Sequence, residues 1–100
     1  MKALFDQISQ EMSELTTKRY STSFSLGISF LDKEIQKPIY AIYGFVRFAD
    51  EIVDTFHGYD KEKLLADFKV QTYEAIAAGI SLNPILNSFQ WAVNRYQIPA

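Results

Sequence analysis

The segment from Ile39 to Phe56, IYAIYGFVRFADEIVDTF, places the strongest constraint on how this chain can fold. It is the most apolar run in the sequence, and it ends in acidic residues. At the angular spacing of a helix, one stripe about 60° wide carries Tyr43, Arg47, Asp50 and Asp54. The opposite arc is apolar. The segment therefore predicts a helix that packs against a core on one side and presents two carboxylates and a guanidinium on the other.

Two interpretations of this stripe remain open from the residues alone. Carboxylates near the end of an amphipathic helix usually face water, and this spacing also occurs by chance. Alternatively, paired aspartates on one helix face suit a Mg²⁺ ion that bridges to a diphosphate, and Arg47 could pair with the diphosphate. Tyr40 and Tyr43 lie on or beside the stripe, where a solvated face would more often carry Lys, Glu or Gln.

Composition excludes several other classes of function. A chain of 100 residues that is 48% hydrophobic is long enough for one core and too short for two ordinary domains, so residues 1–100 are expected to form a single unit. The net charge of −2 without a basic cluster argues against nucleic-acid binding. With no cysteine and only His57, any metal must be a hard ion held by carboxylates, Mg²⁺ or its relative Mn²⁺. The absence of cysteine, a signal peptide and a membrane-spanning run fits a cytoplasmic protein.

The pattern along the chain predicts an all-α fold, because apolar residues recur every three to four positions and no run alternates as a strand would. A first helix is expected over residues 4–15 and a second, short one after the hydroxyl-rich stretch at 20–25. Asp32 could cap the third, which should kink or restart at Pro38 and stop at a left-handed Gly58. Asp60 should cap a helix that closes at Gly79, and Asn83-Pro84 should start a last one.

The same periodicity predicts which side chains form the core. In the order of the chain, they are Leu4, Phe5, Ile8, Met12, Leu15, Ala41, Phe45, Phe48, Ile52, Phe56, Leu64, Leu65, Phe68, Tyr73, Ile76, Ala77, Ile85, Leu86, Phe89, Trp91, Ala92, Val93 and Tyr96.

Two stretches of the sequence resemble elements of a known family, the squalene and phytoene synthases, which are head-to-head prenyl synthases. Residues 20–27, YSTSFSLG, are similar to the family's early Ser-x-Ser-Phe element. Residues 41–54, AIYGFVRFADEIVD, are similar to its first aspartate-rich segment, in the form closer to phytoene synthases. The two stretches stand in the family's order at about its spacing, and the resemblance extends across most of the chain.

This resemblance implies the helical isoprenoid synthase fold and a Mg²⁺-dependent condensation of two prenyl diphosphates, farnesyl or geranylgeranyl diphosphate. By the same matching, Asp50 and Asp54 would hold the metal. Arg47 and Ser23 would contact a diphosphate, and the cavity near it would be lined by Ser21, Phe24 and Tyr43. The resemblance assigns neither the product nor any use of NADPH, and it leaves room for peripheral contact with a membrane.

The sequence departs from the family pattern because no counterpart of the second aspartate-rich motif follows Asp54. A turn signal at Ile98-Pro99-Ala100 follows directly on the last helix. We therefore expect the N-terminal part of such an enzyme, inactive by itself. Two alternatives remain: a non-catalytic helical interaction module, and a head-to-tail prenyl diphosphate synthase or terpene cyclase. The Ser-x-Ser-Phe element argues against the latter.

Overall fold

The computed structural model describes residues 1–99, which form five helices and, over that range, no strand. The helices are α1 (Lys2–Tyr20), α2 (Thr22–Ser29), α3 (Lys33–Asp54), α4 (Lys61–Ala78) and α5 (Pro84–Tyr96). The predicted all-α class is confirmed. The turn predicted at Ile98-Pro99-Ala100 includes Ala100, which lies outside the described residues.

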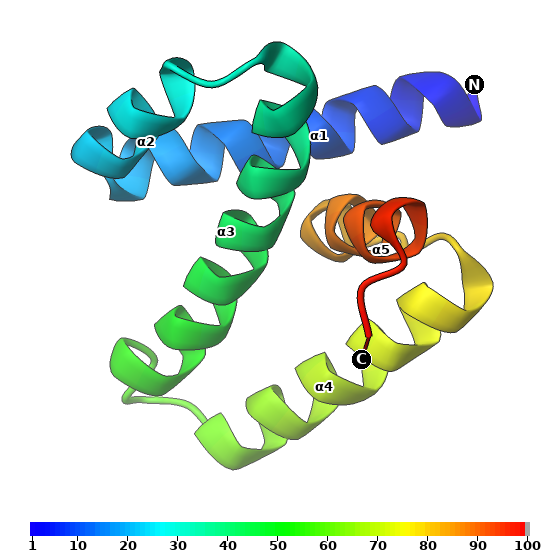
Figure 1. Ribbon diagram of the computed structural model, residues 1–100. Coiled ribbons are helices and arrows are strands. Elements are labelled where there is room, and N and C mark those ends of the chain that lie inside the picture. Colours follow the sequence, from blue (N-terminus) through cyan, green and yellow to red (C-terminus); the bar gives the residue numbers. More distant parts are fainter. Residues whose placement is uncertain (100) are drawn as a thin grey trace.

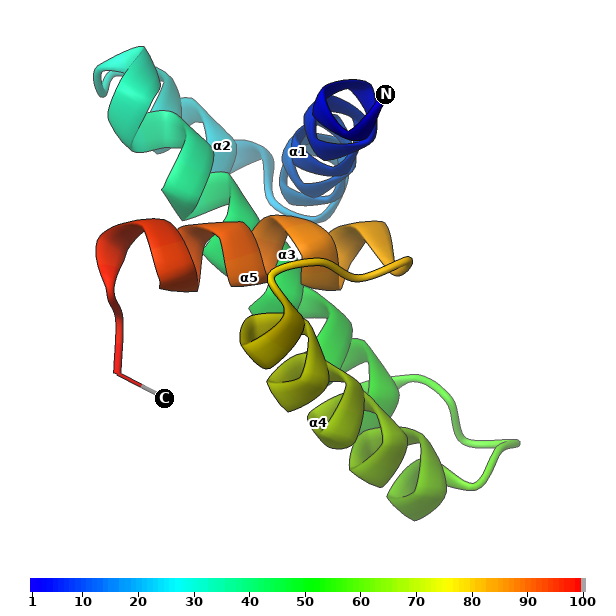
Figure 2. The same ribbon diagram turned by 90° about the vertical axis from the view of Figure 1, so that its right-hand side faces the viewer.

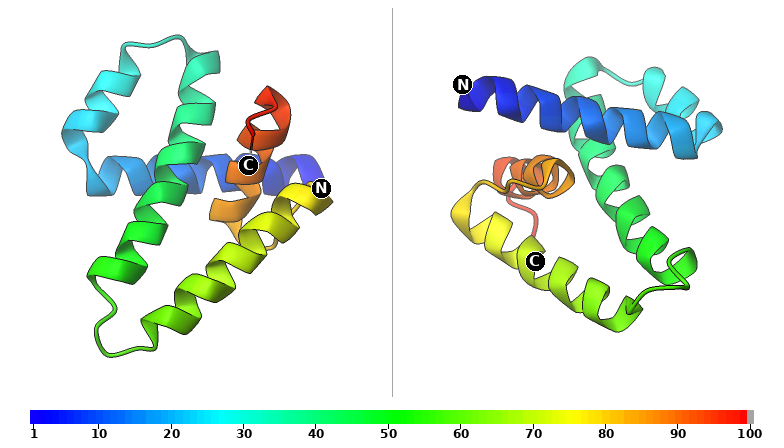
Figure 3. Two further views of the ribbon diagram at one scale, coloured as in Figure 1. Left: turned by 60° about the horizontal axis from the view of Figure 1, so that its bottom comes forward. Right: turned by 180° about the vertical axis from the view of Figure 1, so that it is seen from behind.

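The other four helices all pack against α3. α1 crosses the N-terminal half of α3 (Figure 1). A loop follows the C-terminal end of α3, and α4 runs back from that loop. α5 lies across both α3 and α4 (Figure 2). In the left view of Figure 3, α3 and α4 diverge from the loop that joins them, and α5 lies between them. No helix within residues 1–99 has both the length and the apolar character needed to span a membrane.

Three predicted helix boundaries are confirmed, and each depends on a local hydrogen bond or backbone angle. Asp60 caps α4 by accepting a hydrogen bond from the Lys63 amide at 3.1 Å. Asn83 caps α5 by accepting from the amide of Ile85 at 3.0 Å. Gly79 ends α4 with a positive φ of 73°, which glycine adopts without steric cost.

Two predictions for α3 were wrong: a restart at Pro38 and a left-handed stop at Gly58. The helix runs from Lys33 to Asp54 without a restart at Pro38, because a proline in the second turn removes only one hydrogen bond, to the carbonyl of an exposed residue. It ends before His57-Gly58, and Gly58 has no positive φ. A side chain occupies this helix end instead: Lys61 Nζ donates to the carbonyl of Val53 at 2.6 Å.

Aromatic side chains hold α3, α4 and α5 together. The ring of Phe45 stacks between Phe89, at a centroid distance of 3.8 Å, and Phe68, at 5.3 Å. Phe68 also belongs to a buried cluster with Ile52, Ala75 and Leu86. The core assignments in α5 are largely confirmed, because Ile85, Leu86, Ala92 and Val93 are buried.

The face of α1 that packs inward differs from the predicted one. Its buried residues are Ser9, Ser13 and Thr17, which lie four apart on one side of the helix. The apolar face expected in the core is instead exposed over Leu4, Ile8, Met12 and Leu15. α1 approaches α3 at Gly44, where an added Cβ would lie 3.3 Å from three atoms of Ser13. Because the backbones approach this closely, only small side chains fit between them.

Polar side chains connect α1 to α5. The side-chain amide of Asn87 donates to Asp6 Oδ1 at 2.9 Å and to Ser9 Oγ at 3.0 Å. The hydroxyls of Ser13 and Ser88 are hydrogen-bonded to each other. Buried polar groups are tolerated when they are paired in this way, and the pairing sets the register of the two helices.

Several other core assignments were also wrong. α4 buries Phe68, Thr72 and Ala75, so its inward face is narrower than the predicted one. The exposed residues that had been assigned to the core are Phe48, Leu64, Leu65, Tyr73, Ala77 and Tyr96.

Candidate functional site

The acidic stripe predicted on α3 lies in the last two turns of that helix. Asp50 and Asp54 are exposed, and neither takes part in an ion pair or side-chain hydrogen bond within residues 1–99. With Glu51, three carboxylates stand near the negative end of the helix dipole, where cations are the favoured side chains. This arrangement is unfavourable for the helix alone, and a cation bound between Asp50 and Asp54 would relieve it.

The donor set of the stripe fits a hard divalent cation only as a partial site. Two carboxylates four apart on a helix are neighbours, and Mg²⁺ commonly takes one or two carboxylates together with waters and substrate phosphate oxygens. No group of three or more His, Cys, Asp or Glu residues suited to a metal occurs among the described residues. Asp50 and Asp54 could therefore supply two ligands, with the others coming from water and phosphate.

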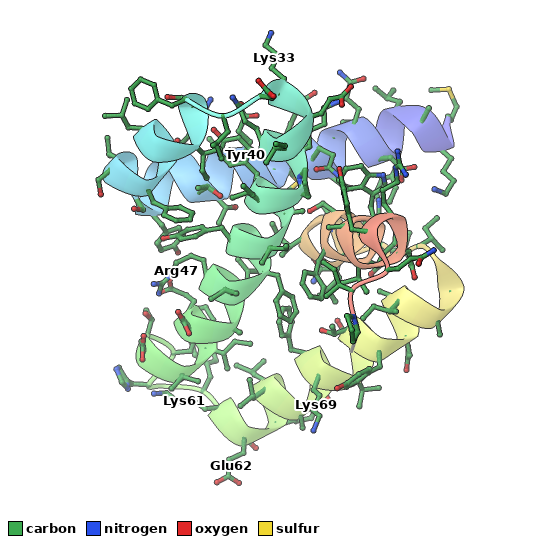
Figure 4. All side chains as sticks on the ribbon, viewed as in Figure 1. Lys33, Tyr40, Arg47, Lys61, Glu62 and Lys69 are labelled. Carbon is green, nitrogen blue, oxygen red and sulfur yellow. The ribbon has the colours of Figure 1, made fainter. Side chains whose placement is uncertain are left out.

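Arg47 lies on the same side of α3, and its guanidinium contacts Glu51 and Tyr20. Nη2 donates to Glu51 Oε2 at 3.2 Å, and the carbon Cζ lies 4.8 Å from the centroid of the Tyr20 ring. The two paired side chains are only 24% and 17% exposed, which shields this ion pair more than an ordinary surface pair. In Figure 4, Arg47 lies to the left of α3, whereas α5 lies to the right.

The pKa values of Tyr20 and Glu51 reflect their mutual contact. A hydrogen bond to the Glu51 carboxylate raises the pKa of the Tyr20 hydroxyl. The pKa of Glu51 is lowered, first by a hydrogen bond from Thr55 and then by those from Tyr20 and Arg47. Glu51 is thus stabilised as a carboxylate by Arg47 within α3, by Thr55 directly after α3 and by Tyr20 at the end of α1.

The Ser-x-Ser-Phe element comes against the stripe through its phenylalanine. The ring of Phe24 stacks on Tyr43 with a centroid distance of 4.6 Å. Ser21 caps α2, and its Oγ accepts from the Phe24 amide at 3.2 Å, whereas the side chain of Ser23 is exposed. Of the residues assigned by resemblance, the structure thus brings Phe24 to Tyr43, and it leaves both serines at the start of α2.

Several apolar hollows adjoin α3 on different sides. One of about 290 Å³ is lined by Tyr20 and Glu51 together with apolar residues of α3 and α4. A hollow of about 190 Å³ lies between α2 and α3 and is lined by Phe24, Ile39, Ile42, Tyr43 and Val46. A larger cavity of about 450 Å³ lies between α3, α4 and α5 and contains none of the residues of the acidic stripe. The 190 Å³ hollow at Phe24 and Tyr43 and the 290 Å³ hollow at Tyr20 and Glu51 therefore both lie next to the candidate site.

Tyr20 and Glu51 are the site residues that the sequence analysis did not single out. The spacing of Arg47 and Glu51, four apart on a helix, is a signal for an ion pair that could have been noticed. Nothing local predicts the contact of Tyr20, because it depends on how the end of α1 crosses α3.

Comparison with protein families identifies the chain. A family model described as squalene/phytoene synthase matches residues 17–100. The chain belongs to the squalene/phytoene synthase family. Members of this family are prenyltransferase-type enzymes of isoprenoid biosynthesis with an isoprenoid synthase helical fold, which agrees with the five helices described above. Searches of curated proteins and of solved structures returned no match.

Proposed function

We propose that this chain supplies one wall of a diphosphate site in the Mg²⁺-dependent, head-to-head condensation of two prenyl diphosphates. The observation that carries the proposal is the pair Asp50 and Asp54, exposed and unpaired within residues 1–99 beside a half-buried arginine. Three features of one helix face therefore suit an anion and its metal: two free carboxylates, one guanidinium and an adjoining apolar hollow.

Each residue of the site has a role in this proposal. Asp50 and Asp54 hold Mg²⁺, or Mn²⁺ in its place, which would supply charge neutralisation for a departing diphosphate. Arg47 binds the diphosphate oxygens through the terminal N–H groups that Glu51 leaves free. Ser23, exposed at the start of α2, contacts the diphosphate as well, and Ser21 lines the cavity beside Phe24. The Phe24–Tyr43 stack lines the hollow and keeps water from the first carbons of the prenyl chain.

The chemistry follows from these roles and from the family. Loss of diphosphate from one farnesyl or geranylgeranyl diphosphate leaves an allylic cation, which the double bond of a second molecule attacks. Loss of a proton then closes a cyclopropane that still carries the second diphosphate, and departure of that diphosphate begins the rearrangement. Aromatic faces such as Tyr43 stabilise a nearby cation. The phytoene-type product is the one we favour, because residues 50–54 read DEIVD. With two carboxylates in the metal site, the 100-residue chain alone is expected not to turn over.

Titration calorimetry with inorganic pyrophosphate, with and without Mg²⁺ at constant ionic strength, tests the proposal. Asp50→Asn and Asp54→Asn should each weaken binding in the presence of Mg²⁺ by about tenfold or more, a loss of roughly 1.4 kcal/mol. Without Mg²⁺ the same substitutions should not weaken binding, because they remove negative charge near an anion. The effect of the two substitutions on the affinity for pyrophosphate thus differs with and without Mg²⁺, as a metal bound between the carboxylates and the pyrophosphate requires.

Asp67→Asn is the matched control, since Asp67 is an exposed carboxylate on α4 whose ion-pair partner within residues 1–99 is Lys63. It should leave the affinity for pyrophosphate unchanged. Binding by the unmodified chain that shows no dependence on Mg²⁺ would refute the proposal and favour the helical interaction module. That alternative draws on the exposed apolar face of α1.

A further inference from the structure

The contacts of Arg47 restrict a side chain that is otherwise flexible. An arginine has several rotatable bonds, and holding one rotamer for an anion costs conformational entropy at the moment of binding. In this structure the Arg47 side chain is already held in one conformation without a ligand. The ring of Tyr20 lies under the guanidinium, and Glu51 accepts from one of its nitrogens.

The other N–H donors of Arg47 have no hydrogen-bond acceptor in the part of the chain that the structure describes. Nε is buried and has no hydrogen-bond partner within residues 1–99. The single pairing to Glu51 uses Nη2, so it orients the guanidinium without occupying all of its N–H groups. Glu51 lies on the same helix one turn after Arg47, and its side chain is only 17% exposed, so the carboxylate itself has little freedom to move.

We propose that Glu51 and Tyr20 are positioning residues that hold the Arg47 guanidinium beside Asp50 and Asp54, ready to bind a diphosphate. This inference rests on the proposed function for its ligand and on the observed contacts for its geometry. Glu51 acts through Arg47 from the same helix, and Tyr20 acts from the end of α1. The arrangement explains why a third acidic residue is present at this helix end without being available to a metal.

Glu51→Gln separates positioning from simple electrostatics, because the two roles predict opposite signs. If the carboxylate only reduced the positive charge of Arg47, its removal would strengthen the binding of pyrophosphate. If it positions Arg47, its removal should weaken binding about fivefold, in the range expected for releasing one rotamer-rich side chain. Affinity that is unchanged or stronger in Glu51→Gln would overturn the proposal. Glu62→Gln on α4, the same substitution at an exposed site far from Arg47 (Figure 4), is the control and should change nothing.

Tyr20 is tested by keeping or removing its ring. Tyr20→Phe keeps the ring under the guanidinium and should retain most of the affinity, whereas Tyr20→Ala should lose about as much as Glu51→Gln. Tyr59→Ala, at a highly exposed tyrosine, is the control. Equal losses in Tyr20→Phe and Tyr20→Ala would contradict a role for the ring.

A second measurement does not depend on any ligand. In ¹⁵N–¹H spectra of the free chain, the Nε–H signal of Arg47 should be slow to exchange with solvent and should exchange faster in Glu51→Gln, while the backbone amide signals away from the site stay in place. An unchanged Arg47 signal would overturn positioning even if pyrophosphate binds. Failure of the unmodified chain to bind pyrophosphate, with the Arg47 signal responding as expected, would instead refute only the proposed function.

Discussion

The crossing of α1 and α3 at Gly44 allows a stability prediction with a definite sign. In Gly44→Ala, the new Cβ would lie 3.3 Å from the Cα, Cβ and Oγ of Ser13. One of these atoms, the Cα, belongs to the backbone. The hydroxyl of Ser13 is hydrogen-bonded to that of Ser88, which holds the Ser13 side chain against α5. The neighbour therefore cannot rotate away, and the two helices must separate by a few tenths of an ångström.

Two opposing terms decide the net effect. Alanine is favoured over glycine in a helix interior by about 1 kcal/mol. Overpacking a tight contact costs about 1–3 kcal/mol, and with three atoms involved we take a value near 2 kcal/mol. Gly44→Ala should thus destabilise the fold by about 1 kcal/mol, which lowers the melting temperature of a domain of this size by roughly 4–8 °C.

Gly27→Ala is the matched control. Gly27 is also inside a helix, but nothing lies within 4 Å of an added Cβ, so only the helix-propensity gain of up to about 1 kcal/mol applies. Urea unfolding followed by circular dichroism should give midpoints that move in opposite directions with an unchanged m value. A Gly44→Ala variant as stable as the original chain would refute the argument from close packing. The penalty should also shrink in the background of Ser13→Gly, which removes two of the three crowded atoms.

Two further predictions concern pH and a helix cap. The pKa of Asp6 is lowered from its ordinary value of 3.8, first by its hydrogen bond with Lys2 and then by that with Asn87. Its contribution to stability is therefore present above that ordinary value and is lost as the pH falls below it, through the lowered pKa of the folded chain. Asp6→Asn should therefore flatten the fall of the urea midpoint between pH 5 and pH 3, and an identical pH profile would contradict the role of this carboxylate. Asn83→Ala should cost about 1 kcal/mol, because the amides of Ile85 and Leu86 lose the side-chain acceptor that caps α5. Asn83→Ser, which keeps a capping oxygen, should recover most of that loss in thermal unfolding, and equal losses in both variants would rule out capping as the cause.

The sequence alone predicted the acidic stripe of the site, but it did not predict all the residues that contact it. Helical periodicity alone places Asp50, Asp54 and Arg47 on one face, and the structure has them there. The resemblance to a family implies that Phe24 and Tyr43 line the same cavity, and the fold brings these two rings into contact. One partner of Arg47 could be predicted from the sequence and the other could not. Glu51 lies four residues after Arg47 on the same helix, whereas Tyr20 contacts Arg47 only because α1 packs against α3.

Local chemistry in the sequence determined where helices begin and end at Asp60, Gly79 and Asn83, because a cap or a left-handed glycine acts on its own few residues. Only the tertiary structure decided which face of α1 is buried. The apolar pattern of Leu4, Ile8, Met12 and Leu15 correctly predicts a helix, but it does not specify which neighbour that helix meets or at what distance. The backbones of α1 and α3 approach closely at Gly44, so the small side chains of Ser9, Ser13 and Thr17 pack inward and the larger apolar ones remain outside.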